Sequence, residues 1–330
     1  MKKSVRLVCY AVGFAALAVT GALAQAPSIQ LVSTFDYPGT GNQTRPQKIS
    51  DKNDIVGIYV DSSGVSRGFI FFNNGAFSAP LVDPSDNSGL TEGRGINNQR
   101  YVCGDYFDAT SATYHGFFFA HGHYQNFDLA GATDTIILGL NNARDFAGST
   151  VINGGFQEGF LSIGGTPNKF AITDATATLA YQLNTSDQSC GYYIDSAGAD
   201  HGFWRDTNGT INSPIDPAGS TSTILFGNND GNQMVGRYTD SSGVTHGILF
   251  IPSADVFVVY DFPGSTFTSL NGINKNGMIV GRYTDASGID HGIILQVTRT
   301  NGPTVTLPLA PPSAPVKGAP QAQGFVAPAY

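Results

Sequence analysis

A short word, Val-Gly-x-Tyr or a close variant, recurs six times along this chain of 330 residues. Its glycines follow one another at intervals of 43 to 47 residues, at Gly57, Gly104, Gly148, Gly191, Gly236 and Gly281. A fixed period of this length is typical of a four-stranded propeller blade. The repeat limits the fold strongly, because each unit has to bury its apolar face against its neighbours.

Each unit contains four short β-type runs separated by turn signals. In the last copy the first three runs are "TFTSLNGIN", "GMIVGRYT" and "HGIILQVT", whereas the N-terminal run "IQLVSTFDYPG" is of the fourth type. Each type reaches six only if this first strand joins the last unit, a 3+1 closure that removes exposed edges. We therefore expect an all-β, six-bladed β-propeller with 3+1 ring closure over residues 25–297. A β-solenoid of stacked repeats is the alternative.

Both ends of the chain differ from the repeats. Residues 1–24 combine Lys2, Lys3 and Arg6 with an apolar run and end in small residues, which is typical of a secretory signal peptide. Residues 298–330 are rich in Pro and Ala without a period, which predicts a flexible tail. We expect an exported protein, periplasmic, extracellular or on the cell surface, with no membrane span in the mature chain.

The charge and composition narrow the classes of partner. The formal net charge is −8, and the predicted leader would remove further positive charge, which argues against nucleic acid and anionic lipid as partners. Charged residues make up only 13% of the chain while glycine occurs 41 times, so solubility has to come from amides and hydroxyls. The oligomeric state stays open.

The recurring pattern of Gly-Ile-Asn, Val-Gly-x-Tyr-x-Asp, a glycine turn, His-Gly-Phe or His-Gly-Ile, and Asp-x-Pro-Gly resembles a bacterial family of extracellular repeat proteins, the HAF repeats. The His-Gly words here begin at His115, His201, His246 and His291. The resemblance covers residues 28–297 and implies an exported bacterial protein, with no catalytic motif to carry over. Two copies depart from the pattern, because Arg67 and Glu158 stand in place of the histidine.

One repeated word, "RYTDSSGVTHG" at residues 237–247, looks at first like a small catalytic or metal-binding cluster. Its spacing instead fits a hairpin in which Asp240 and Gly243 shape the turn while Tyr238 and His246 face each other across it. Histidines of neighbouring blades would lie on the order of 10 Å apart, and zinc needs ligands at ~2 Å. We therefore expect no metal site and no cofactor, and calcium held by loop carboxylates has no motif in its support.

The two cysteines of the expected mature chain occupy one position of the repeat. Cys103 and Cys190 each precede the glycine of the Val-Gly word, where the other copies have Val or Ala. Small buried apolar side chains are expected there. Because the second and fourth blades of a ring are not neighbours, we expect two free thiols and no disulfide.

The copies differ where the innermost strands begin. After a threonine found in every copy, the last, first and second copies have Ser269, Arg45 and Glu92, whereas the other three have Ile136, Leu179 and Ile224. Ring closure would bring the polar residues together into one sector at the mouth of the central channel. Further polar residues two positions along each strand enlarge this sector: Gln47, Arg94 and Asn271.

These features predict a binding or interaction scaffold, with Arg45, Gln47, Glu92, Arg94, Ser269 and Asn271 as ligand-binding candidates for a saccharide or another cell-envelope component. An alternative is a propeller-type glycoside hydrolase or lyase that uses Glu92, with Arg45 or Arg94 holding an anion. Such chemistry needs a second carboxylate in register, which the sequence does not offer, so no catalytic residue is predicted. A purely structural surface protein is the third alternative.

Overall fold

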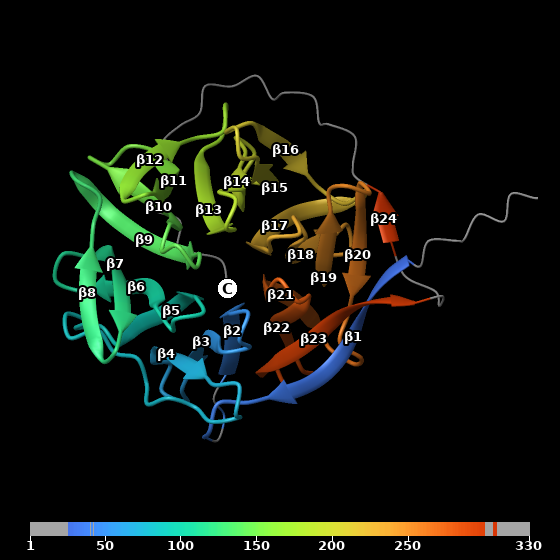
Figure 1. Ribbon diagram of the computed structural model, residues 1–330, viewed down its shortest axis with the longest axis horizontal. Coiled ribbons are helices and arrows are strands. Elements are labelled where there is room, and N and C mark those ends of the chain that lie inside the picture. Colours follow the sequence, from blue (N-terminus) through green and yellow to red (C-terminus); the bar gives the residue numbers. More distant parts are fainter. Residues whose placement is uncertain (1–25, 40, 42, 301–305, 309–330) are drawn as a thin grey trace, which may run out of the picture.

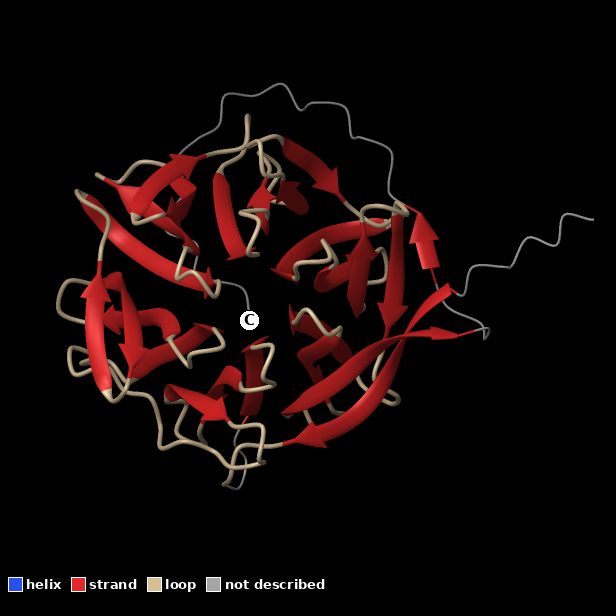
Figure 2. Cartoon of the chain, in the orientation of Figure 1, coloured by secondary structure: helices blue, strands red, loops and turns tan. Residues whose placement is uncertain are grey.

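The structure is a computed structural model that describes residues 26–39, 41, 43–300 and 306–308. The predicted signal peptide, residues 1–24, lies outside the described residues. Within them every regular element is a β-strand. The strands form groups arranged around a centre, as Figure 1 and Figure 2 show, so the fold is an all-β propeller and differs from a stacked solenoid. The described part of the chain contains no helix with the length and apolar character needed to cross a membrane.

Each group is a blade whose first strand lies nearest the centre (Figure 1). The innermost strands are β2 (Gln43–Ile49), β5 (Leu90–Ile96), β9 (Ala132–Leu140), β13 (Ala177–Leu183), β17 (Ser220–Asn228) and β21 (Phe267–Ile273). The next strands outward are β3 (Ile55–Val60), β6 (Val102–Asp108), β10 (Phe146–Ile152), β14 (Ser189–Ile194), β18 (Met234–Asp240) and β22 (Met278–Thr284). All of these pairs are antiparallel.

The third strands of the blades are β4 (Ser66–Phe71), β7 (Thr113–Ala120), β11 (Gln157–Ile163), β15 (Asp200–Arg205), β19 (Thr245–Ile251) and β23 (Asp290–Thr300). Outermost strands are β8 (His123–Phe127), β12 (Thr166–Phe170), β16 (Ile211–Ile215) and β20 (Val256–Tyr260). In the blade of β2 to β4 the outer position holds only the isolated bridges Gly68–Leu81 and Phe71–Phe77. Pro80 lies between these bridges and has no N–H to donate to a ladder.

The N-terminal strand β1 (Ala26–Phe35) pairs antiparallel with β23, from Ala26 opposite Thr300 to Phe35 opposite Gly292. The first described strand of the chain therefore lies on the outer side of the last blade, next to a strand that follows it by more than two hundred residues (Figure 1).

The glycine of the Val-Gly word is explained by a close approach between the first two strands of a blade. A Cβ added at Gly104 would lie 1.9 Å from the carbonyl oxygen of Glu92, and one at Gly236 would lie 2.0 Å from that of Ile224. The register of the pair shifts at this point, as at a β-bulge. Only glycine leaves room for the carbonyl, so the word recurs for a packing reason.

Part of the segment predicted to be a flexible tail, residues 298–330, is ordered into strands. Strand β23 continues to Thr300, and β24 (Thr306–Pro308) pairs antiparallel with β20, with Val256 opposite Pro308. An outermost strand carries unpaired N–H and C=O groups, which a further strand satisfies. Residues 309–330 lie outside the described residues.

Candidate functional site

Residues 237–247, the repeated sequence that looked like a catalytic or metal-binding cluster, form a β-hairpin with a structural role in its blade. Oδ1 of Asp240 accepts the backbone N–H groups of Ser242 and Val244 at 2.8 and 3.0 Å, and Gly243 has φ of 83°. Tyr238 is paired with His246 across strands β18 and β19, and their rings stack at 4.9 Å. The polar groups of this word are thus engaged in shaping the turn and packing across it.

The recurring histidine also joins the third strand of its blade to the end of the fourth. In four copies its Nδ1 lies 2.6 to 2.9 Å from the aspartate that follows the fourth strand: His115–Asp128, His201–Asp216, His246–Asp261 and His291–Asp36. The hydrogen bond to Asp216 is the main cause that raises the pKa of His201. Among the described residues, no three His, Cys, Asp or Glu side chains gather as a metal site would require.

The predicted candidates Glu92 and Arg94 lie in the interior, each 1% exposed. Arg94 forms an ion pair with Glu92 and donates through Nε to Asp105 at 2.8 Å. Glu92 also accepts a hydrogen bond from Oγ of Ser66 at 2.8 Å. Burial raises the pKa of Asp105 to about 6. Both candidates are therefore members of a buried ionic network.

The other four candidates come from the last and first copies, and they contact each other or the strands beside them. Ser269 donates to Oδ1 of Asn271 at 2.6 Å, and Nδ2 of Asn271 donates to the carbonyl of Pro46 at 2.7 Å. Gln47 donates to the carbonyl of Arg45 at 3.3 Å. Arg45 forms an ion pair with Asp290 at 2.7 Å, and its side chain is 21% exposed, the most open of the set.

On the other side of the channel the innermost strands are apolar. Ile136, Leu179 and Ile224 belong to one buried cluster that also contains Tyr181 and Phe226. The channel therefore has a polar and an apolar side, as the differences among copies suggest.

A buried lysine that sequence reasoning missed lies between the innermost strands. Lys48 on β2 is 5% exposed, donates to the carbonyl of Asn271 at 3.3 Å, and lies 5.7 Å from the ring centroid of Tyr181 on β13. Strands β2 and β13 lie on opposite sides of the centre (Figure 1), so this side chain crosses it. Burial lowers the pKa of Lys48 to about 8.

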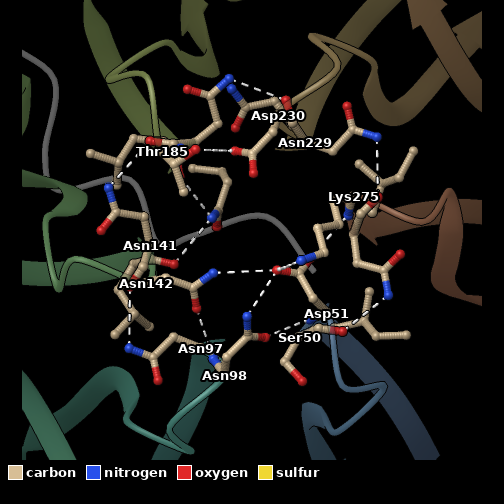
Figure 3. Close-up of a pocket in the computed structure, with 18 of the residues that line it drawn as sticks. Ser50, Asp51, Asn97, Asn98, Asn141, Asn142, Thr185, Asn229, Asp230 and Lys275 are labelled. Atoms are coloured by element: carbon tan, nitrogen blue, oxygen red, sulfur yellow. Dashed lines mark hydrogen bonds and ion pairs between the residues drawn. The ribbon is translucent and has the colours of Figure 1, made fainter.

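A pocket of about 60 Å³ lies where the innermost strands end and turn into the second strands (Figure 3). This is the opposite end of the innermost strands from the predicted polar sector, which lies at their beginning. Amide side chains dominate its lining, because five copies place an asparagine just after the innermost strand, in a Gly-Ile-Asn word or at the equivalent position: Asn97, Asn141, Asn184, Asn229 and Asn274. The first copy has Ser50 at this position.

These asparagines form a chain of hydrogen bonds around the pocket. Each Nδ2 donates to the backbone carbonyl of the equivalent residue in the next copy, at 3.0 to 3.2 Å, from Asn97 through Asn141, Asn184, Asn229 and Asn274 to Ser50. The Oδ1 atoms accept backbone N–H groups of their own turns, as Asn141 does from Ala143 and Asp145. Both ends of each amide are used, so the pocket wall is held in one conformation.

The rim of the pocket is formed by the residue after each of these positions: Asp51, Asn98, Asn142, Thr185, Asp230 and Lys275. Asp51 accepts from Nδ2 of Asn98 and of Asn142 and from the backbone N–H of Lys275, at 2.9 to 3.3 Å. Asp230 accepts from both the N–H and the hydroxyl of Thr185. Thr185, Asp230 and Lys275 are exposed, so a solute reaches the rim from solvent.

The sequence did carry a signal for this pocket. An asparagine at the end of an apolar innermost strand recurs in five copies, and a polar residue at the centre of a ring is a candidate for binding. Nothing in one copy shows that the amide reaches the next, so the sequence assigns this asparagine to the repeat alone.

The sequence matches no protein-family model and no curated protein, so the resemblance to the HAF repeats stays a prediction. Among solved structures, the chain is similar to an Aleuria aurantia lectin mutant in complex with Fucα1-6GlcNAc, at 9% identity and a TM-score of 0.49, over 84% of this chain and 98% of that one. It is similar to TolB from Acinetobacter baumannii, at 9% identity and 0.47, over 78% and 65%. It also resembles the β-propeller domain of the Trilobed protease from Pyrococcus furiosus, at 8% identity and 0.43, over 79% and 100%.

Proposed function

We propose that this protein is an exported binding scaffold, a six-bladed propeller closed 3+1 by β1 on β23, which binds a small polar ligand such as a saccharide at the amide-lined pocket. The observation that carries the proposal is the ring of asparagine amides, each fixed by hydrogen bonds at both ends, around an opening with an exposed polar rim. A site that is already ordered does not have to spend binding free energy on ordering itself.

The chemistry of the lining suits hydroxyl groups. The ring amides are engaged within the protein, so a sugar hydroxyl, which both donates and accepts, would meet the hydroxyl, carboxylate and ammonium groups of the rim at Thr185, Asp230 and Lys275. A volume of about 60 Å³ holds roughly four water-sized groups. Only one edge of a sugar ring would enter, while the rest would lie against Thr185, Asp230 and Lys275 at the rim.

Export is the part of the proposal that rests on sequence. The features of residues 1–24 and the resemblance of residues 28–297 to the HAF repeats both support a place in the periplasm, outside the cell or on its surface. A saccharide of the cell envelope is a ligand available in each of these places.

Binding is favoured over hydrolysis by the position of the nominated carboxylate. Glu92 is 1% exposed and held by Arg94 and Ser66. A glycoside hydrolase needs two carboxyl groups, one of them an acid, that flank the glycosidic bond of a bound substrate. Arg45, with its partly exposed side chain, is the member of the predicted sector that a solute would reach from the other end of the channel.

The proposal is tested by titration calorimetry of the mature protein against a panel of monosaccharides. Thr185→Trp places an indole over the rim and is expected to abolish binding. Thr207→Trp is the matched control, because Thr207 is exposed in a turn between β15 and β16, outside the pocket lining. Absence of binding by the wild type, or equal binding by the two variants, would refute a saccharide site at this pocket.

A further inference from the structure

The rim of the pocket carries a second set of hydrogen bonds between neighbouring copies. A side-chain oxygen of one rim residue accepts the backbone N–H of the rim residue in the preceding copy around the ring, at 2.8 to 3.1 Å. Among the described residues four such bonds are present: Lys275 to Asp51, Asp51 to Asn98, Asn98 to Asn142, and Thr185 to Asp230. The N–H groups of Asn142 and Asp230 have no such partner there. The rim is therefore incomplete on the side of Thr185, Asp230 and Lys275.

Two rim residues are aspartates, and the first of them, Asp51, is bound by an amide at two points. Oδ1 of Asn98 accepts the backbone N–H of Asp51 at 2.8 Å, and Nδ2 of Asn98 donates to Oδ2 of Asp51 at 2.9 Å. The other carboxylate oxygen of Asp51 accepts the N–H of Lys275. The N–H and Oδ2 of Asp51 thus form a donor and an acceptor side by side, which a neutral group with the matching pair satisfies.

The second rim aspartate, Asp230, is placed in the same way but lacks this amide. Its Oδ1 accepts the N–H and the hydroxyl of Thr185 at 3.0 and 2.7 Å. The next copy has Lys275 in place of an asparagine, and a lysine side chain has no acceptor. Within the described part of the chain no hydrogen bond engages the N–H or Oδ2 of Asp230. Asp230 and Lys275 are both exposed, and Figure 3 shows Asp230 across the mouth from Asp51 and Asn98.

We propose that Asp230 determines which ligand the pocket binds, because its backbone N–H and Oδ2 bind two neighbouring hydroxyl groups of a neutral saccharide. The ligand takes the place on Asp230 that Asn98 takes on Asp51. One hydroxyl accepts the N–H while its neighbour donates to the carboxylate, a charge-assisted hydrogen bond. This inference rests on the proposed function and adds the residue that recognises the ligand and the groups that it recognises.

The charges at the rim favour a neutral ligand. A ligand carboxylate could accept the N–H of Asp230, but it would lie against the carboxylate of that residue. The rim cation Lys275 is already 3.8 Å from a second carboxylate, that of Asp51. An ammonium group could pair with Asp230 but has no oxygen or lone pair to accept the N–H. Two adjacent hydroxyls satisfy both groups without adding charge.

Asp230→Asn tests the carboxylate directly, by titration calorimetry with glucose, galactose, glucuronate and galacturonate as probes. An asparagine can still accept the N–H of Thr185 through Oδ1, as Asn98 does from Asp51, but it presents an NH₂ group in place of Oδ2. The hexoses are expected to bind about tenfold or more weakly, the effect of a lost hydrogen bond to a charged group. The uronates are expected to gain relative to the hexoses.

Asp255→Asn is the matched control for this variant. It removes the same charge at an exposed turn between β19 and β20, outside the pocket lining. Binding of the four probes should be the same as in the wild type.

Lys275→Asn tests whether the place on Asp230 is vacant for an amide. By equivalence with Asn98, the new side chain would bind the N–H and Oδ2 of Asp230 and compete with the ligand. Lys275→Ala is the comparison, because it removes the same ammonium group without supplying an amide. We expect Lys275→Asn to bind hexoses about tenfold more weakly than Lys275→Ala and to unfold at a higher urea concentration. The unfolding comparison needs no ligand.

The outcomes distinguish the two proposals. Hexose binding that Asp230→Asn leaves unchanged, or that is equal in the two Lys275 variants, would overturn the role of Asp230 and leave the saccharide pocket standing. Equal urea midpoints of the Lys275 variants would likewise overturn it, because the place on Asp230 would then not accept an amide. No hexose binding by the wild type would overturn the proposed function and this inference with it. Should Asp230→Asn fail to fold, the two Lys275 variants still carry the test.

Discussion

The side-chain amide of Asn274 donates to the backbone carbonyl of Ser50 at 3.0 Å, and at Ser50 the chain of asparagine amides around the pocket stops. Five copies pass a hydrogen bond to the next blade through this position, whereas the hydroxyl of Ser50 accepts the N–H of Asp54 in its own turn. Between the blades of β2 and β5 the remaining cross-links here include the backbone N–H of Asp51, which donates to Asn98.

Completing the ring should stabilise the protein. In Ser50→Asn the new amide would reach the carbonyl of Asn97, by equivalence with the other copies, and add one hydrogen bond. We expect the free energy of unfolding in urea to increase by about 1 kcal/mol. The reverse change, Asn141→Ser, removes a bond to Asn184 and should lower it by about 1 to 3 kcal/mol. If all three proteins had the same free energy of unfolding, these hydrogen bonds between blades would not contribute to stability.

Lys48 should make stability depend on pH. Its pKa falls from 10.5 to about 8 in the folded protein because burial disfavours the charged form, which corresponds to about 3 kcal/mol. Below pH 8 the folded state bears this cost in full. Between pH 8 and 10.5 the buried amine loses its proton while the unfolded chain keeps it, so this contribution makes stability rise with pH.

Lys48→Met is the variant that isolates this effect. We expect it to be more stable than the wild type at pH 7.5, with an advantage that shrinks by pH 9.5. The comparison has to be the difference between the two proteins at each pH, because the buried thiols also titrate on unfolding. Urea unfolding at both pH values measures it, and a constant difference would show that Lys48 stays charged.

His201 offers a direct measurement of a raised pKa. Its Nδ1 lies 2.6 Å from Asp216, its Nε2 lies 3.4 Å from Asp195, and its ring stacks on Tyr193. The resulting stabilisation is complete below pH 6.5 and is lost as the pH rises through the raised pKa. Titration of its ring protons by NMR should give a pKa above 6.5, and Asp216→Asn should lower it. If Asp216→Asn left the pKa of His201 unchanged, a group other than Asp216 would be the one that raises it.

The hairpins could be derived from the sequence because their determinants are local. The turn from Asp240 to Gly243 sets the register, and the register places Tyr238 opposite His246. The contrast between Glu92 and Ile136 in equivalent positions likewise shows which side of the channel is polar. Alternation along a strand and a fixed period are enough for such inferences.

The pocket and the lysine could not be derived in this way, because they depend on contacts between copies. Whether the amide of Asn141 reaches Asn184 depends on the distance between two blades, which no residue within one blade determines. In a regular ladder the side chain of Lys48 would point either toward solvent or toward a neighbouring strand. The register shift between Pro46 and Lys48 changes its direction, and its length carries it across the ring.

Cys103 and Cys190 should be inert while the protein is folded. Cys103 and Cys190 are free and fully buried, and burial raises the pKa of both, that of Cys190 to about 12. A thiolate is the reactive form, so a raised pKa and a closed surface both oppose modification. We expect no reaction of the native protein with an aromatic disulfide reagent at pH 8, and reaction of both thiols after unfolding in guanidinium. Rapid reaction of a native thiol would mean that the blades open around β6 or β14, and Lys48→Met would then show whether the buried charge causes that opening.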